Sequence, residues 1–489
     1  MQPLVLLAVL TALAVTDAAG NSPVDAAAWR FASVLGIIGG LGLVAVGVSR
    51  QTARELYRNF DARRLVLIRF AWLRRAHHAL WLAAISVILC NLSWPQLVRG
   101  NWGLERAFLL DEVLILAPVL LPLIVAWGAF YDVDRAVRRG QSKDNSAVRI
   151  WSRGEYLSFH IRHYLGLLLV LLLGLLALGD GLDRVGSRLL ESPNGWMAFA
   201  PPIALLCLFF PAILRFVWGA EPLADGALRR RLELTARRAG FQATDILVWR
   251  TGGSLVNAAV AGIVPQLRYV FLSDALLARM SDAEVEAVFA HEIGHIRHHH
   301  LLLRAMAVVA PVAVWLAMNG LASGASAGAT VNAGSYVASA ANMSTALSIV
   351  ALGAYLLIVF GFYSRRLEEQ ADLFGCQTVS GLVTLASSDQ GEESRLARSY
   401  HGITDAGIAI YVAALEKLAS LNGQRRQSGS WEHSSVAARV EFLQHMRNKP
   451  AQAAIFHRRL RLAAGLVVGL VVGGLGAPLF WQFFSVGAF

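Results

Sequence analysis

Eight apolar runs, each long enough to cross a lipid bilayer, constrain this chain more than any other feature. A membrane-spanning helix needs about 20 mostly apolar residues. Of the 489 residues, 56% are hydrophobic and only 16% are charged, which is too apolar for an ordinary soluble protein. The runs cover residues 31–49, 79–94, 108–130, 161–179, 195–218, 303–321, 345–363 and 463–484. We therefore expect an all-α polytopic membrane protein with about eight transmembrane helices in a lipid bilayer.

Arginines gather in alternate loops between these runs and predict the direction of the chain. The loop at 50–78 holds eight arginines and the loop at 131–160 holds five arginines and a lysine, whereas residues 322–344 carry no charge. Positively charged loops stay on the cytoplasmic side. Both polar segments, 219–302 and 364–462, then also face the cytoplasm. The net charge of +11 comes from these membrane-flanking loops, so we expect no nucleic-acid partner, and we place the protein in a bacterial inner membrane.

The apolar runs and polar segments together predict the domain organisation. Residues 1–20 are a short apolar stretch that is typical of a signal peptide, or of an N-terminal anchor because no Lys or Arg precedes the apolar core. The further predicted parts are a five-span membrane domain at 21–218, a polar segment at 219–302, a transmembrane hairpin at 303–363, a second polar segment at 364–462 and a last transmembrane helix at 463–489. Short β-branched and aromatic runs within 245–277 predict a small antiparallel β-sheet.

A metal-binding pattern, HEIGH, lies just before the sixth apolar run. The capping box SDAE predicts that a helix begins near Asp282. On that helix His291 and His295 are four residues apart, so both imidazoles can reach one Zn²⁺. Glu292 lies off that face, where it can take a proton from a zinc-activated water that attacks a peptide carbonyl. The pattern predicts a zinc metalloendopeptidase with one Zn²⁺ per chain and a peptide or protein substrate, membrane-associated proteins included.

A catalytic zinc site of this kind needs a third protein ligand. The histidine that a metzincin has six residues after His295 is a leucine here, and residues 301–367 contain no Asp, Glu, His or Cys. The first candidate downstream is Glu368, which the two intervening spans return to the membrane face of the histidines. Asp372 shares its helical face, where it can orient a ligand histidine or pair with an arginine, whereas Glu369 points about 100° away.

These residues resemble the integral-membrane zinc metallopeptidases that include the HtpX heat-shock protease and the type I CAAX prenyl protease. The resemblance rests on VFAHEIGHI at 288–296, SRRLEEQAD at 364–372 and VNAAVAG at 256–262, with a weaker echo in WEHSSVAARVEFL at 431–443. It implies a cytoplasmic, mainly helical metallopeptidase domain of the gluzincin type, which carries the small sheet.

The same resemblance implies roles for individual residues. It makes His291, His295 and Glu368 the zinc ligands, with Glu292 as the general base and Asp372 as a residue that supports a ligand. It also implies substrate binding by Asn257 and Ala258, on an edge strand that pairs with the substrate backbone, and by His433 and Arg439. The process served would be membrane protein quality control or processing.

Two other functions stay open on the sequence alone. One is a non-catalytic membrane receptor or scaffold in which zinc is structural. The other is a site-2-type intramembrane protease, which would place HExxH within a span and take an aspartate from a second span. We predict that His298, His299 and His300 form a polar collar at the lipid headgroups; the alternative is that one of them donates a hydrogen bond beside the zinc site.

Overall fold

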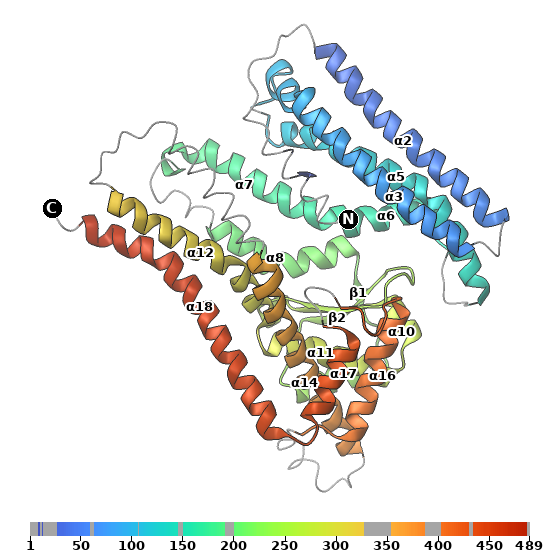
Figure 1. The fold of residues 1–489 in the computed structure, drawn as a ribbon, viewed down its shortest axis with the longest axis vertical. Helices are drawn as coiled ribbons and strands as arrows, with labels where there is room; N and C mark the ends of the chain where they lie inside the picture. The colour runs from blue at the N-terminus through green and yellow to red at the C-terminus, as the bar shows by residue number, and fades with distance from the viewer. Residues whose placement is uncertain are drawn as a thin grey trace. The chain divides into compact units, whose positions relative to one another are not determined.

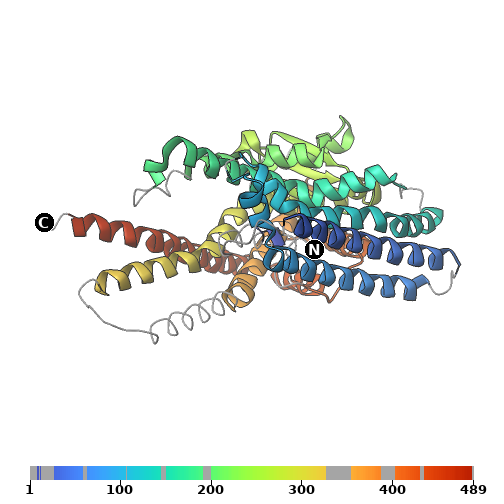
Figure 2. The same ribbon diagram turned by 90° about the horizontal axis from the view of Figure 1, so that it is seen from above.

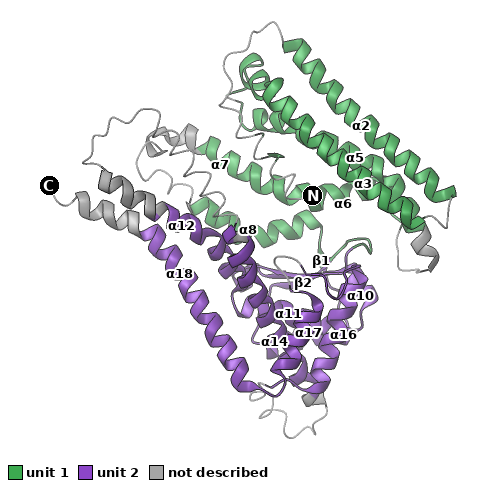
Figure 3. Ribbon diagram, viewed as in Figure 1, with its two compact units in different colours: residues 1–221, 249–254 green, residues 222–248, 255–489 purple. Residues whose placement is uncertain are grey.

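The computed structural model describes most of the chain, which forms two compact units (Figure 3). The first unit contains residues 1–221 and 249–254, and the second contains residues 222–248 and 255–489. The described residues are 27–58, 63–105, 107–144, 150–190, 200–326, 354–386, 402–429 and 434–486, together with Ala8, Val9 and Ala12. Apart from these three residues, the predicted signal peptide or anchor lies outside the described residues, as do residues 345–353 of the predicted span at 345–363.

Five long helices and two short ones, α4 and α6, are described in the first unit (Figure 1). They are α2 (Ala27–Arg58), α3 (Arg63–Ser86), α4 (Trp94–Gln96), α5 (Leu110–Asp144), α6 (Arg153–His160), α7 (Leu167–Leu190) and α8 (Ala200–Trp218), with π-helical turns at Val87–Asn91, Leu97–Asn101 and Ile161–Gly166. Helix α2 packs along α5. Buried tryptophans join neighbouring helices, since the indole N–H groups of Trp81 and Trp94 donate to the carbonyls of Val119 and Leu114 at 3.0 Å each.

Helices long and apolar enough to cross a membrane occur throughout the described residues. Five meet both conditions: Ala27–Arg58, Leu110–Arg139, Arg153–Gly181, Pro201–Trp218 and Pro450–Gly476. A sixth span results if Arg63–Asn91 and Trp94–Asn101, which are bent by 52°, count as one; the bend falls where Pro95 follows Ser93, whose φ is 45°. The chain is a multi-pass membrane protein. The count of eight spans and the cytoplasmic side of the loops stay predictions.

The second unit combines a small β-sheet with helices that precede and follow the HEIGH motif along the chain (Figure 1). Its strands are β1 (Glu221–Pro222, at the junction between the units), β2 (Asp245–Trp249), β3 (Ala258–Ala261) and β4 (Tyr269–Ser273). Its helices are α9 (Ala227–Arg238), α10 (Asp274–Arg279), α11 (Asp282–Arg297), α12 (His300–Ser326), α14 (Gly361–Ala386, after a π-helical turn at Tyr355–Phe360), α16 (Asp405–Leu421), α17 (Val436–Met446) and α18 (Pro450–Val486). A 3₁₀ turn covers Pro265–Leu267. The apolar helices α12 and α18 lie side by side (Figure 1 and Figure 2).

The sheet has the strand order β1-β2-β4-β3, which leaves β3 at an edge. Strand β3 pairs with β4 in antiparallel register from Ala258 opposite Leu272 to Ala261 opposite Tyr269. The sheet as a whole is mixed, so the prediction of an antiparallel sheet is correct for this pair and wrong for the whole. Neighbours β2 and β4 are not consecutive in sequence, and their relative direction is therefore not fixed by a hairpin turn.

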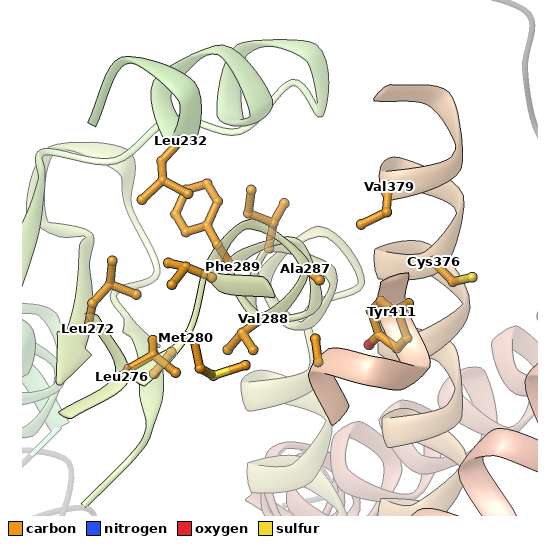
Figure 4. Close-up of a cluster of buried hydrophobic side chains, with 14 of the residues drawn as sticks. Leu232, Leu272, Leu276, Met280, Ala287, Val288, Phe289, Cys376, Val379 and Tyr411 are labelled. Atoms are coloured by element: carbon orange, nitrogen blue, oxygen red, sulfur yellow. The ribbon is translucent and has the colours of Figure 1, made fainter. Parts of the chain in front are cut away.

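Helix α11, which carries the HEIGH motif, runs through the hydrophobic core of this unit. It begins at Asp282 behind a capping box of Ser281 and Glu284, as the sequence predicts. Phe289 packs beside Leu232 of α9, and the opposite side of α11 faces α14 and Tyr411 of α16 (Figure 4). Because the core clamps α11 on both sides, the backbone that carries the motif is fixed in place.

Candidate metal centre

Three ligand atoms from two helices converge at one point. His291 and His295 of α11 and Glu368 of α14 each offer an atom within 4.8 Å of the others. The two Nε2 atoms are 3.1 Å apart, Glu368 Oε2 lies 3.7 Å from His291 Nε2, and Glu368 Oε1 lies 3.6 Å from His295 Nε2. Ligands at zinc's usual bond lengths of about 2 Å sit about 3.3 Å apart around a tetrahedral ion. The donor set and its spacing therefore fit Zn²⁺.

Two glycines let α11 and α14 approach closely enough to bring these ligands together. A Cβ on Gly294, inside the HEIGH motif, would lie 3.1 Å from the Cα of Ala371. A Cβ on Gly375 would lie 2.7 Å from the Tyr411 ring and 3.1 Å from the backbone nitrogen of His291. Such distances are too short for a side chain without movement of the neighbouring helix. The glycines thus set the helix spacing that allows Glu368 to reach the histidines.

The far nitrogen of His291 is held by a buried polar group. His291 Nδ1 lies 3.1 Å from Asp372 Oδ1 and 3.0 Å from the Tyr411 hydroxyl. Tyr411 donates its own proton to Asp372 at 2.9 Å, and Arg439 Nε donates to Asp372 Oδ2 at 2.7 Å. Both neighbours of Nδ1 are therefore acceptors, so Nδ1 carries the hydrogen and Nε2 is left to bind a metal.

The electrostatics of these groups follow from burial and pairing. Burial raises the pKa of Asp372, but the charge and hydrogen bonds of Arg439, together with His291, outweigh it and hold that pKa well below its usual range. For His291 burial lowers the pKa, yet the hydrogen bonds to Asp372 and Glu368 raise it to about 9. Burial also raises the pKa of Glu292 to about 7, with His291 opposing the shift and Glu368 adding to it. Glu292 is thus poised to exchange a proton near neutral pH.

The candidate ligand Glu368 also has a cationic neighbour. Arg304 Nη2, from the first turns of α12, donates to Glu368 Oε1 at 2.6 Å. Glu369, by contrast, pairs with Arg366 at 2.6 Å. The two adjacent carboxylates therefore point to different partners, as their positions on the helix predict.

A cavity of about 580 Å³ opens over these residues. Its lining includes the start of the edge strand, Asn257 and Ala258, together with His291, Glu292 and Arg439. Helix α16 and the segment that leads to α17 complete the lining. A cavity that places an unpaired strand edge next to a metal-ligand cluster suits an extended peptide.

Comparison with known proteins identifies this part of the chain. Residues 222–388 match the sequence profile of peptidase family M48. The chain carries a peptidase family M48 domain. The matched residues include all three candidate ligands and the edge strand, while Tyr411 and Arg439 lie beyond them.

Curated relatives share part of their length with this chain. A protease HtpX homolog from Limosilactobacillus fermentum is 27% identical over 205 residues, which are 39% of this chain and 64% of that protein. CAAX prenyl protease 1 from Saccharomyces cerevisiae is 36% identical over 83 residues, which are 17% of this chain and 18% of that protein. The chain thus spans less than two thirds of either relative.

A solved structure was also matched. The crystal structure of S. mikatae Ste24p covers 85% of this chain and 98% of its own, with 16% sequence identity and a TM-score of 0.39. A score of that size does not establish a common fold, so the architecture rests on the elements described above.

The residues predicted for substrate binding differ in their burial and in their contacts. In the M48 domain Asn257 exchanges hydrogen bonds with Ser273, its backbone N–H donating to the Ser273 hydroxyl at 2.9 Å and its carbonyl accepting from the Ser273 N–H at 3.0 Å. Ala258 begins β3 and is buried. Arg439 lines the cavity and binds Asp372. His433 lies outside the described residues.

The predicted histidine collar is wrong for His300. His299 is exposed, as a collar requires, but His300 is fully buried with its Nδ1 2.8 Å from Nδ1 of His295. His298 is partly buried and stacks on His457. The collar fails because a break after α11 gives His299 a φ of 55°, and the chain then turns His300 back toward the metal centre.

Two further residues at this centre are missed by sequence reasoning. Tyr411 follows Asp372 by 39 positions and belongs to no pattern, so no local signal marks it. Arg304 carried a signal that could have been used: it lies one turn after His300 on the helix that continues the motif, which places it near any ligand bound there.

Proposed function

We propose that this protein is a membrane-embedded, zinc-dependent endopeptidase that hydrolyses peptide bonds at the cytoplasmic membrane face. The observation that carries the proposal is the convergence of His291, His295 and Glu368 beside Glu292, in a cavity bordered by an open strand edge. The M48 domain supports a metallopeptidase. Zinc as the metal, endopeptidase specificity and the cytoplasmic side are part of the proposal.

The metal would be held by His291 Nε2, His295 Nε2 and a carboxylate oxygen of Glu368. Bound Zn²⁺ supplies Lewis acidity, which activates water and polarises the scissile carbonyl. Glu292 accepts the proton of the attacking water and returns it to the leaving amine. Its pKa of about 7 in the buried site suits both transfers at neutral pH.

Substrate orientation comes from the sheet. Among the described residues, strand β3 pairs with β4 on one side only, so its other side can accept an extended segment by main-chain hydrogen bonds. Asn257 and Ala258 lie at the cavity end of this strand. Such pairing recognises backbone more than side chains, which fits an endopeptidase acting on unfolded or membrane-associated proteins, and we keep substrate roles for His433 and Arg439 within this proposal.

The test separates chemistry from metal binding at Glu292. Substitution Glu292→Gln in the purified full chain should leave one zinc per chain and abolish cleavage of a fluorescently quenched, unfolded polypeptide. Glu284→Gln, on an outer turn of the same helix, is the matched control and should cleave normally. Unchanged cleavage by Glu292→Gln would contradict the proposed role.

Two alternatives make different predictions. A receptor or scaffold with structural zinc would show no turnover in the wild type under any condition. A site-2-type intramembrane protease needs HExxH inside a span, and among the described helices α11 does not meet the criteria of length and hydropathy for one. The cavity and the raised pKa of Glu292 favour the catalytic function over a structural one.

A further inference from the structure

Four side chains form a hydrogen-bonded row that leads from His295, the second proposed zinc ligand, to His457. His295 Nδ1 lies 2.8 Å from His300 Nδ1, and His300 Nε2 lies 3.0 Å from the amide oxygen of Gln370. The amide nitrogen of Gln370 lies 2.9 Å from His457 Nδ1. These residues belong in turn to α11, α12, α14 and α18. His300 is fully buried and Gln370 is 5% exposed, so water does not compete for the central hydrogen bond between them.

The row has a direction, because each group allows only certain roles. The amide oxygen of Gln370 accepts, so His300 Nε2 carries the hydrogen, and in a neutral imidazole Nδ1 is then the acceptor. His300 Nδ1 must receive its hydrogen bond from His295 Nδ1–H. That leaves the lone pair of His295 on Nε2, which faces His291 Nε2 at 3.1 Å and Glu368 Oε1 at 3.6 Å.

Reversal of the row would disable the site. If the amide of Gln370 turned over, its N–H would face His300 Nε2, and every hydrogen bond would then point the other way. His295 would carry its hydrogen on Nε2, where it would block a metal ion. In the orientation described, His457 Nδ1 accepts from the amide nitrogen of Gln370, so the reversal would also require His457 to move its hydrogen to Nδ1. His457 itself stacks on His298, with ring centroids 5.6 Å apart, which holds its ring in place.

We propose that His300 and Gln370 are positioning residues that hold His295 in its metal-binding tautomer, and that His457 links this tautomer to helix α18. The proposal rests on the proposed function, since zinc is the metal concerned. Helix α18 contains a candidate membrane span, Pro450–Gly476, and its Leu460 packs with Ala307 of α12 and Leu367 of α14. The metal affinity of the M48 domain therefore depends on how α18 packs against α12 and α14.

The experiment measures zinc affinity of the full chain in detergent by competition with a chromogenic chelator, and the absorption spectrum of the Co²⁺-loaded protein. His300→Leu should weaken zinc binding about 10- to 100-fold, which is the usual cost of removing a group that orients a metal ligand, and should alter the Co²⁺ spectrum. His300→Asn keeps an acceptor near the Nδ1 position and should retain most of the affinity. His299→Asn, next to it but exposed, is the control and should match the wild type.

Two further variants test the rest of the row. Gln370→Leu should weaken zinc binding even though it leaves His300 in place, and His457→Phe should weaken it least. Thermal melting identifies any variant that does not fold; if His300→Leu is one, Gln370→Leu decides. Wild-type affinity and an unchanged Co²⁺ spectrum in a folded His300→Leu or Gln370→Leu protein would overturn the proposal.

Equal losses in His300→Leu and His300→Asn would also overturn it, because packing and not the hydrogen bond would then matter. Unchanged affinity in His457→Phe would overturn the link to α18. A wild-type protein that binds no stoichiometric zinc would instead refute the proposed function itself, and this inference with it.

Discussion

The two histidines of the HEIGH motif lie one turn apart on α11, but they are supported in opposite ways. Behind His291 is an ionised pair, Asp372 with Arg439, while behind His295 is the neutral imidazole and amide of His300 and Gln370. A buried ion pair polarises the ligand strongly but costs free energy to desolvate. A neutral row costs less and depends on the orientation of one amide. His291 is thus oriented by an ion pair, whereas His295 is oriented only by the direction of hydrogen bonds between neutral groups.

The largest expected effect comes from the residue that both ligands face. Glu368→Ala should lose zinc and all peptidase activity, because a catalytic zinc site needs three protein ligands. Glu369→Ala removes the next carboxylate, which pairs with Arg366, and should keep both. Metal analysis and the cleavage assay measure the two variants side by side. If Glu369→Ala lost zinc and activity while Glu368→Ala kept both, the third ligand would be Glu369 and not Glu368.

On the His291 side, removal of the cation should be the next most damaging change. Arg439→Met leaves the Asp372 carboxylate buried without its partner, which typically costs about 3–5 kcal/mol of stability. The double variant Asp372→Asn with Arg439→Met removes both charges and should recover part of the lost stability. It should not recover activity, because a neutral amide at position 372 orients His291 less strongly than a carboxylate does. Unfolding by denaturant gives the stabilities. A double variant less stable than Arg439→Met would show that the pair is not an isolated charge unit.

The smallest effect is expected at Tyr411. Tyr411→Phe removes one hydrogen bond to Asp372 and leaves Arg439 and His291 on the same carboxylate, so stability should fall by about 1 kcal/mol and zinc should remain bound. The same unfolding and metal measurements check this. Loss of zinc in Tyr411→Phe would mean that the phenol, more than the carboxylate, sets the orientation of His291.

Some features of the metal centre can be predicted from the sequence and others cannot. The positions of His291, His295 and Glu368 follow from helical spacing and from a long stretch without other ligands, and the capping box places the start of α11 correctly. Asp372 follows from its spacing of one turn from Glu368. These patterns can be recognised along the linear sequence, without knowledge of the contacts between helices.

Other features depend on contacts between distant segments, and the sequence does not reveal them. Tyr411 reaches the site only because Gly375 lets α16 approach α14. The burial of His300 depends on a chain reversal at His299, which no glycine or proline marks. The mixed direction of the sheet depends on which strands become neighbours, and alternation of residues within a strand does not determine this.

The central claim is that one zinc ion at this centre drives peptide cleavage. The most direct measurement strips the purified protein of metal with a chelator and then follows cleavage of an unfolded polypeptide during addition of zinc. We expect no cleavage after stripping and complete recovery at one zinc per chain, while Glu292→Gln should bind the same single zinc without turnover. Full cleavage by the stripped protein would contradict the claim.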